Sequence, residues 1–354
     1  MKTRVSWSPS VYAALGAAAL FGASTPFAKV LLKGTSPVLL AGLLYLGSGI
    51  GLGLIRLLRD RGWRMPSLSR SEWGWLALAI GLGGVSGPLL LMWGLATTSA
   101  AAASLLLNLE AVLTAVIAWV VFRENTDRNV VLGMIVIVVG AVLLAWPDTQ
   151  QSTSGWSRGS LFIAGACLCW ALDNNFTRKV SASDALFLAG LKGMVAGVVN
   201  TGIALALGAA LPGTVAVGEA MTVGLLGYGV SLVLFVLALR GLGTARTGAY
   251  FSTAPFIGAA IAILFFGEQV GGVFWVVFVL MAGGVWLHLA ERHEHMHTHE
   301  AITHTHRHVH DAHHQHTHDF PWDGREPHTH EHTHAPITHS HPHYPDIHHR
   351  HRHP

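Results

Sequence analysis

Residues 89–124 read LLLMWGLATTSAAAASLLLNLEAVLTAVIAWVVFRE, and residues 233–268 read VLFVLALRGLGTARTGAYFSTAPFIGAAIAILFFGE. The two stretches align without gaps at a shift of 144 residues. Their identities are few but evenly spaced, and they include the pairs Leu95 and Leu239, Ala101 and Ala245, Ile117 and Ile261, Phe122 and Phe266, and Glu124 and Glu268. The run LAGL at residues 40–43 also recurs at residues 188–191, a shift of 148. This pattern predicts two structural repeats.

The sequence around these copies is apolar on the scale of a membrane. The chain is 51% hydrophobic and 12% charged, with 40 glycines and a mean hydropathy of +0.46. These values are typical of a polytopic membrane protein and exclude an ordinary soluble enzyme. About 20 apolar residues are needed for a helix to cross the hydrocarbon layer. Ten stretches meet this need, near residues 11–32, 38–58, 73–96, 101–122, 130–146, 159–176, 186–207, 220–239, 247–266 and 273–290.

Each repeat therefore holds five helices. Because five is odd, the second repeat must enter the membrane from the side opposite to the first, which is the pattern of transporters built from inverted repeats. We predict an all-α polytopic membrane protein with ten transmembrane helices. The predicted segments are an N-terminus (1–10), a first repeat (11–146), a linker (147–158), a second repeat (159–290) and a tail (291–354).

Positive charge predicts the orientation. With the N-terminus in the cytoplasm, thirteen Lys and Arg residues fall on the inside and three on the outside. Charge also switches between equivalent positions of the repeats: Arg123 and Arg128 correspond to Gly267 and Gly272, whereas Ala96 and Ala102 correspond to Arg240 and Arg246. Arginine thus follows the cytoplasmic side and not the repeat. We predict a bacterial inner-membrane protein with both termini in the cytoplasm.

Short motifs recur in order along both halves. They are LFGASTP at 20–26, GLATTSAA at 94–101 and FRE at 122–124, then ALRGLGTA at 238–245, AP at 254–255 and FGE at 266–268. In these motifs the chain resembles the drug/metabolite transporter superfamily, in particular its EamA-type members, over roughly residues 11–290. The resemblance implies a secondary transporter, often an exporter, and not an enzyme. The family's substrates range over amino acids, sugars, nucleotide-sugars and drugs.

The chain departs from the family pattern at three positions. Leu44 stands where the family often has arginine, and Lys192 is its counterpart in the second half. Ala111 replaces a proline and follows Glu110. These departures weaken any inference of substrate from better-known relatives.

Charged and amide side chains inside the apolar stretches are the candidate transport residues, because a charge at the bilayer centre costs at least about 2.5 kcal/mol. Glu110, close to Asn108, is placed to couple proton movement to substrate exchange, or else to hold helices together as a neutral acid. Asp173, followed by Asn174, lies at the same depth as Lys192. Asp173 and Lys192 therefore form either an ion pair or a substrate contact.

All 24 histidines occur at or after His288, and most alternate with other residues. Residues two apart in an extended chain lie on one side, so alternating histidines can supply several imidazoles to one ion. We predict a tail that binds Zn, Ni, Co or Cu through His293, His295, His297, His299, His304, His306, His308, His310, His328, His330, His332 and His334. A pH-responsive polycation is the alternative. Several prolines and few apolar runs predict a disordered tail.

Three functions fit these observations. The first is export of a small metabolite or drug, with the tail sensing or buffering metal. The second is efflux of divalent Ni, Co or Zn, with the tail as a collector. The third is a membrane-anchored metal store or sensor that transports nothing. We expect no cofactor to be required for transport, the lipid bilayer and a small molecule or metal ion as partners, and no nucleic acid. A homodimer is left open.

Overall fold

The computed structural model describes residues 9–61, 68–122, 128–146, 157–177, 180 and 184–289, together with four short strands in the tail. In order, the helical elements are α1 (Pro9–Leu31), α2 (Pro37–Asp60), α3 (Arg70–Ala79), the π-helical segment η1 (Ile80–Ser86), α4 (Gly87–Thr97), α5 (Ala100–Leu106), α6 (Asn108–Phe122), α7 (Arg128–Ala145), α8 (Arg158–Thr177), α9 (Ala185–Ala206), α10 (Thr214–Gly224), the π-helical segment η3 (Leu225–Val230), α11 (Ser231–Phe251), α12 (Ala254–Leu264) and α13 (Gly272–Leu289).

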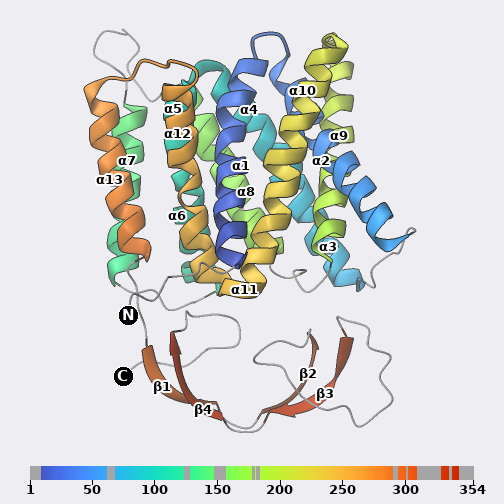
Figure 1. Ribbon diagram of the computed structural model, residues 1–354, viewed down its shortest axis with the longest axis vertical. Helices are drawn as coiled ribbons and strands as arrows, with labels where there is room; N and C mark the ends of the chain where they lie inside the picture. Colours follow the sequence, from blue (N-terminus) through green and yellow to red (C-terminus); the bar gives the residue numbers. More distant parts are fainter. Residues whose placement is uncertain are drawn as a thin grey trace, which may run out of the picture.

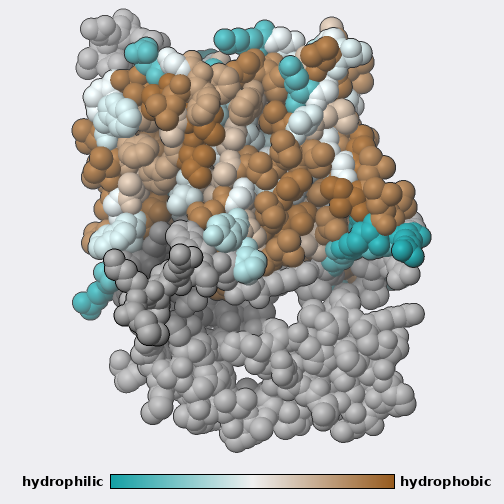
Figure 2. All heavy atoms as spheres, viewed as in Figure 1, coloured by the Kyte–Doolittle hydropathy of each residue, from teal (hydrophilic) through white to brown (hydrophobic). Residues whose placement is uncertain are grey.

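Among the described residues, seven helices are long and apolar enough to cross a membrane, counting α3 to α4, α5 to α6, and α10 to α11 as one helix each. The other three crossings are α8, which carries polar residues near one end, and the shorter apolar helices α12 and α13. The face of the bundle seen in Figure 2 is a hydrophobic belt with polar residues towards its two ends. Exposed Leu132, Ile135 and Val139 on α7 belong to the belt. Such a surface is stable only in contact with lipid.

The ten crossings form two inverted repeats, as predicted. Successive crossings run in opposite directions, so that α1 and α8 start from opposite faces of the bundle (Figure 1). The helix starting at Pro9 and the helix ending at Leu289 share one face, here called the terminal face. Pairs of helices from the two halves pack together: α2 along α9, α7 along α13, and α1 along α11. Gly49 and Gly193 allow the backbones of α2 and α9 to touch, since a Cβ on Gly193 would lie 2.6 Å from the Gly49 nitrogen.

The third helix of each repeat contains a π-helical segment. η1 interrupts the crossing between α3 and α4, and η3 interrupts the crossing between α10 and α11. The segments occupy equivalent positions, because residues 81–86 correspond to residues 225–230 at the shift of 144. Short π-helical segments inside α-helices are frequent at functional sites.

A helix break also falls at equivalent positions in the two halves. In the first half, α5 ends at Leu106 and α6 begins at Asn108. In the second half, α11 ends at Phe251 and α12 begins at Ala254. Leu107 and Phe251 are 144 residues apart, so these breaks are also equivalent. The first break lies about 10 Å along the crossing from Ala100, at about 1.5 Å per residue.

The second break falls later than the sequence indicates. A turn was expected between residues 239 and 247, but α11 continues through this region to Phe251. Pro255 explains the new start, since it occupies the first turn of α12, where a missing N–H costs nothing. Gly241, Gly243 and Gly248 lie inside α11, and a helix tolerates each for about 1 kcal/mol.

The described residues of the tail form four short strands. β1 (Glu294–His299) pairs with β4 (Ile337–Pro342), and β2 (Ile302–His308) pairs with β3 (His328–His334), each antiparallel. Figure 1 draws two separate ribbons. The strands form because pairing satisfies their backbone N–H and C=O groups without a packed core, and because threonine favours an extended backbone. Of the predicted metal ligands, His293 and His310 lie outside the described residues.

Candidate functional site

The π-helical segment η1 presents backbone carbonyls to both halves of the protein. The Gly83 carbonyl accepts hydrogen bonds from the Tyr45 hydroxyl on α2, at 3.0 Å, and from the Trp170 Nε1 on α8, at 2.9 Å. The Gly84 carbonyl accepts one from the Asn200 Nδ2 on α9, at 3.3 Å. Tyr45, Trp170 and Asn200 are all buried. Irregular backbone inside a membrane is stable where other groups satisfy it in this way.

The predicted ion pair between Asp173 on α8 and Lys192 on α9 is present. Asp173 is buried, and its carboxylate also accepts a hydrogen bond from the Thr177 hydroxyl at 3.0 Å. The pair lies against η1, because a Cβ on Gly83 would overlap the Asp173 side chain and a Cβ on Gly84 would lie 3.4 Å from the Lys192 Cγ. Thus α8 and α9 of the second repeat hold a pair of opposite charges against η1 of the first repeat.

Glu110 makes a separate contact between α6 and α8. Its carboxylate accepts a hydrogen bond from the Asn174 Nδ2 at 2.9 Å, and Asn174 also lies 3.5 Å from the Thr114 hydroxyl. Glu110 is partly buried, while Asn174 is exposed. Asp173 and Asn174 are adjacent in α8 and so project about 100° apart, which separates the two polar groups around the helix.

Asn108 does not join Glu110. Its Nδ2 donates to the Leu105 carbonyl at 3.0 Å and lies 3.9 Å from the Met281 sulfur. The Cys167 thiol donates to the Leu106 carbonyl at 3.7 Å. Both bonds satisfy carbonyls beside the break between α5 and α6, so Asn108 stabilises the broken helix that holds Glu110.

Aromatic side chains from both repeats meet beside η1. Phe21 on α1 contacts Trp170, Tyr228 and Phe251, with ring centroids 6.3, 6.0 and 5.3 Å away. Tyr45 contacts Tyr228 at 5.4 Å. We call these five residues the aromatic junction. It joins α1 and α2 of the first repeat to α8, η3 and α11 of the second, and it borders the Gly83 carbonyl.

The two π-helical segments receive side chains in the same manner. Gly83 and Gly227 are 144 residues apart. A Cβ on Gly83 would lie 2.6 Å from the Asp173 Cβ of α8, and a Cβ on Gly227 would lie 2.5 Å from the Ser24 Cβ of α1. α8 and α1 are the first helices of their repeats. The same close contact between a π-helical segment and the first helix of the other repeat therefore occurs twice in the bundle.

Sequence reasoning missed Tyr45, Asn200 and both π-helical segments. The available signal was the density of glycine at residues 81–87 and 224–229, which the pattern of hydropathy does not distinguish from helix packing. Of the predicted residues, the structure brings Glu110 to Asn174 and Asp173 to Lys192, and it places Asn108 on another contact. The transport roles of these residues stay predictions.

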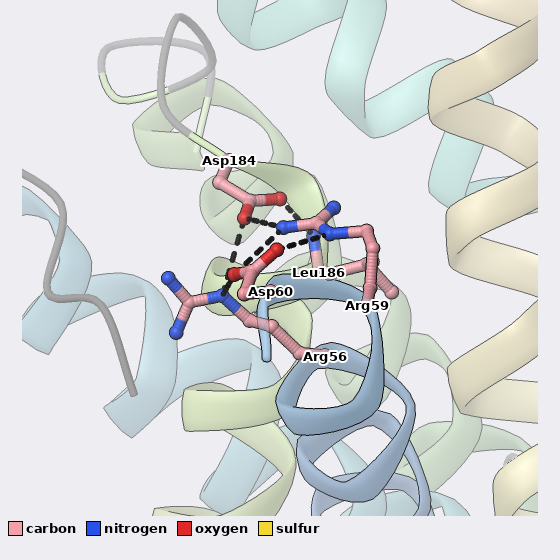
Figure 3. A network of polar contacts seen from close by, with 5 residues as sticks. All are labelled: Arg56, Arg59, Asp60, Asp184 and Leu186. Atoms are coloured by element: carbon pink, nitrogen blue, oxygen red, sulfur yellow. Dashed lines mark hydrogen bonds and ion pairs between the residues drawn. The ribbon is translucent and has the colours of Figure 1, made fainter. Parts of the chain in front are cut away.

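An ionic network ties α2 to α9 at the terminal face (Figure 3). Asp184, which caps α9 by accepting from the Leu186 nitrogen at 3.0 Å, lies 2.5 Å from Arg59 Nη2 and 3.2 Å from Arg56 Nε. Asp60 completes the network at 2.6 Å from Arg59 Nε. Burial alone would raise the pKa of the Asp184 carboxyl, but hydrogen bonds from the two arginines hold this pKa below its usual range.

A second polar network lies at the opposite face. The Glu268 carboxylate accepts hydrogen bonds from the Ala100 and Ala101 nitrogens, at 2.9 and 2.8 Å, and so caps the start of α5. The Lys29 Nζ donates to the Leu95 carbonyl at 2.6 Å, near the end of α4. Glu268 thus ties the segment before α13 to α5 across the repeats, and Lys29 ties α1 to α4 within the first repeat.

Among the residues whose side chains the structure describes, no group of three His, Cys, Asp or Glu could hold a metal ion. The side chains of the tail are outside that set.

An inverted pair of five-helix repeats, with broken helices and charged groups at their junction, defines a membrane transport protein. A sequence profile of the EamA-like transporter family matches residues 8–146 and again residues 157–290. The chain belongs to the EamA-like transporter family.

Similar proteins agree with this assignment. An uncharacterized transporter of Methanothermobacter thermautotrophicus is 29% identical over 285 residues, covering 75% of this chain and 82% of the relative. The uncharacterized transporter YyaM of Bacillus subtilis is 24% identical over 256 residues, covering 68% of this chain and 82% of the relative. A solved crystal structure, titled only as that of a protein, superposes with a TM-score of 0.60 at 17% identity and covers 79% of this chain and 98% of its own. That last likeness concerns the fold.

Proposed function

We propose that this transporter exports a small organic metabolite or drug from the cytoplasm of a bacterium, and that its tail binds metal on the cytoplasmic side. The observation that carries the first part is the aromatic junction beside the Asp173–Lys192 pair. Flat aromatic faces can bind the apolar part of a small organic substrate, and a pair of opposite charges can bind a polar group on the same substrate. The two π-helical segments and the end of α11 contribute to this place, as in transporters whose substrates bind at interrupted helices.

The charges favour an organic substrate over a dehydrated metal ion. Lys192 neutralises Asp173, and its ammonium group would repel a divalent cation. Glu110 is engaged by the Asn174 amide. A transition metal prefers several imidazole, thiolate or carboxylate ligands together. An organic molecule needs only one or two polar contacts in an aromatic setting.

Glu110 is the proposed coupling residue. It is a carboxyl group inside a crossing, at a break in its helix, and its partner Asn174 can donate to an ionised carboxylate or accept from a neutral acid. Proton uptake and release at Glu110 would therefore change the hydrogen bond between α6 and α8 without leaving a polar group unsatisfied. Such a change can link a proton to the movement of one helix against another.

Both termini are proposed to lie in the cytoplasm, because positive charge is concentrated in the segments on that side. β1 begins five residues after α13 ends, so the tail emerges at the terminal face. In this orientation the tail meets cytoplasmic metal and lies outside the path through the helices.

Everted membrane vesicles provide the test. Accumulation of tryptophan, an aromatic cationic dye and radiolabelled Ni²⁺ is compared with and without a proton gradient in wild type, Glu110→Gln and a truncation after His293. Glu219→Gln is the matched control, since Glu219 is an exposed carboxylate in another crossing. We expect an organic probe to accumulate in wild type, in the truncation and in Glu219→Gln, and to be lost in Glu110→Gln.

Each other outcome has a meaning. Gradient-driven accumulation in Glu110→Gln refutes the coupling role of this residue. Tail-dependent accumulation of Ni²⁺, with no organic probe transported, replaces the proposal by metal efflux. Failure to transport any probe, in vesicles where the protein is folded and abundant, favours the metal store or sensor.

A further inference from the structure

Histidine stands opposite histidine in both ribbons of the tail. The register aligns five such pairs: His295 with His341, His297 with His339, His304 with His332, His306 with His330, and His308 with His328. His339 and His341 were not among the ligands expected from the sequence. Their role follows only from the register, because β4 lies about forty residues after β1.

The pairs share one face of each ribbon. Successive residues of a strand alternate between faces, and residues directly opposite each other belong to the same face. His299 and His334 lie on the histidine faces as well, opposite Ile337 and Ile302. The other face holds no histidine within the described strands; in β2 and β3 it carries Thr303, Thr305, Arg307, Thr329, Glu331 and Thr333.

The spacing of these positions suits a metal ion. Residues opposite each other in an antiparallel pair have Cβ atoms about 4.5–5.5 Å apart. Neighbours on one face of a strand are about 6.8 Å apart, two residues at about 3.4 Å. Two adjacent pairs therefore bring four histidine positions onto one small part of the ribbon face. Tetrahedral ions such as Zn²⁺ take four ligands, with about 2.0–2.1 Å between metal and imidazole nitrogen.

Protonation of the histidines opposes this register. Like charges directly opposite each other destabilise a strand pair, so five facing histidine pairs oppose pairing whenever they are protonated. A shift of the register by one residue would place His304 and His306 opposite threonine or glutamate positions of β3 and would remove the facing histidine pairs. We infer that each ribbon is a separate site for a divalent first-row transition ion, bound between facing histidine pairs.

Metal binding would then order the tail. β1 pairs with β4 and β2 with β3, so the inner ribbon is nested within the loop that the outer ribbon closes. Closing such loops costs conformational entropy, which bound metal offsets because it binds the folded form. The inference rests on the proposed metal-binding tail and adds its ligands, its two sites and its metal-dependent structure.

The test moves histidines to the other face without changing composition. The β2 variant breaks two facing pairs by exchanging neighbouring residues. It combines His304→Thr with Thr305→His, and His306→Arg with Arg307→His. In β1 the equivalent exchange is His295→Met with Met296→His, and His297→Thr with Thr298→His. The matched control exchanges Thr305 and Arg307 and leaves every histidine in place. Full-length protein is purified in detergent, and bound Zn²⁺ is measured by equilibrium dialysis.

We expect wild type and control to bind one tight Zn²⁺ per ribbon. Each exchange should weaken its own site about tenfold or more and leave the other site unchanged. Equal binding by wild type and the exchanged variants overturns the inference while leaving a metal-binding tail. Absence of binding by wild type overturns the proposed metal-binding tail itself.

Spin labels measure the register directly. Labels at Thr303 and Thr333 lie opposite each other, whereas labels at Thr303 and Thr329 are four residues out of register. Cys167 and Cys169 are replaced by alanine in both variants so that only the introduced cysteines are labelled. Zn²⁺ should produce dipolar broadening in the first pair and little in the second. Equal broadening in both pairs, or no change with Zn²⁺, contradicts metal-dependent pairing in this register.

Discussion

Replacing Gly83 by alanine tests the contact that positions the charged pair. Gly83 lies in η1 and faces Asp173 of α8. An added Cβ would lie 2.6 Å from the Asp173 Cβ and would also overlap the carboxylate. Rotating the carboxylate cannot relieve the first overlap, because the Asp173 Cβ is fixed to the backbone. The helices must move apart.

The expected cost combines three effects. Overpacking costs about 1–3 kcal/mol. Replacing a helical glycine by alanine returns about 1 kcal/mol. Displacing Asp173 weakens its pair with Lys192, and complete loss of a partner from a buried pair costs about 3–5 kcal/mol. If about half of the pairing is lost, Gly83→Ala lowers the free energy of unfolding by about 2–4 kcal/mol.

Gly81→Ala is the matched control, since a Cβ on Gly81 meets nothing within 4 Å. This change should leave stability unaltered or raise it by up to about 1 kcal/mol. Unfolding in mixed micelles with increasing dodecyl sulfate measures both variants, and vesicle transport is measured beside it. Equal stability of Gly83→Ala and Gly81→Ala would show that η1 and α8 are not in close contact.

Three further changes probe other contacts. Lys192→Met should cost about 3–5 kcal/mol in the same unfolding assay, and adding Asp173→Asn should recover most of it; additive losses would refute a direct pair. Glu268→Gln should cost about 1 kcal/mol, because one N–H at the start of α5 loses a charged acceptor, and an unchanged unfolding midpoint would argue against this cap. Asp184→Asn keeps a cap for α9 but loses the ion pair with Arg59, at about 1 kcal/mol. Since the pKa of folded Asp184 lies below its ordinary value of 3.8, the wild-type advantage should be complete above that value and disappear as pH falls through the folded pKa. An advantage that persists in stronger acid would exclude the carboxylate as its source.

The fold was predictable because membrane crossings are visible locally. A helix such as α2 needs only a long apolar run, and the inversion follows from an odd number of helices per repeat. The end of α11 at Phe251 was not predictable from hydropathy, because the helix continues through the less apolar residues between the stretches 220–239 and 247–266. Pro255 gave a stronger signal than the glycines before it.

The site was predictable only in part, for a different reason. Asp173 and Lys192 could be paired because their depths follow from helix length. The contact between Glu110 and Asn174 required knowledge of which helices are neighbours and how each is rotated. Tyr45 and Asn200 gave no signal, since their partners are backbone carbonyls that only the π-helical segment makes available.

The repeat explains why these irregularities occur in pairs. Gly83 receives Asp173 from α8, and Gly227 receives Ser24 from α1, so each half supplies the π-helical segment for one contact and the inserted side chain for the other. The two contacts differ in energy, because one carries a charged pair with Lys192 and the other a serine bonded to the Phe21 carbonyl at 2.6 Å. The first helix of each repeat therefore packs against the π-helical segment of the other repeat through similar but chemically unequal contacts.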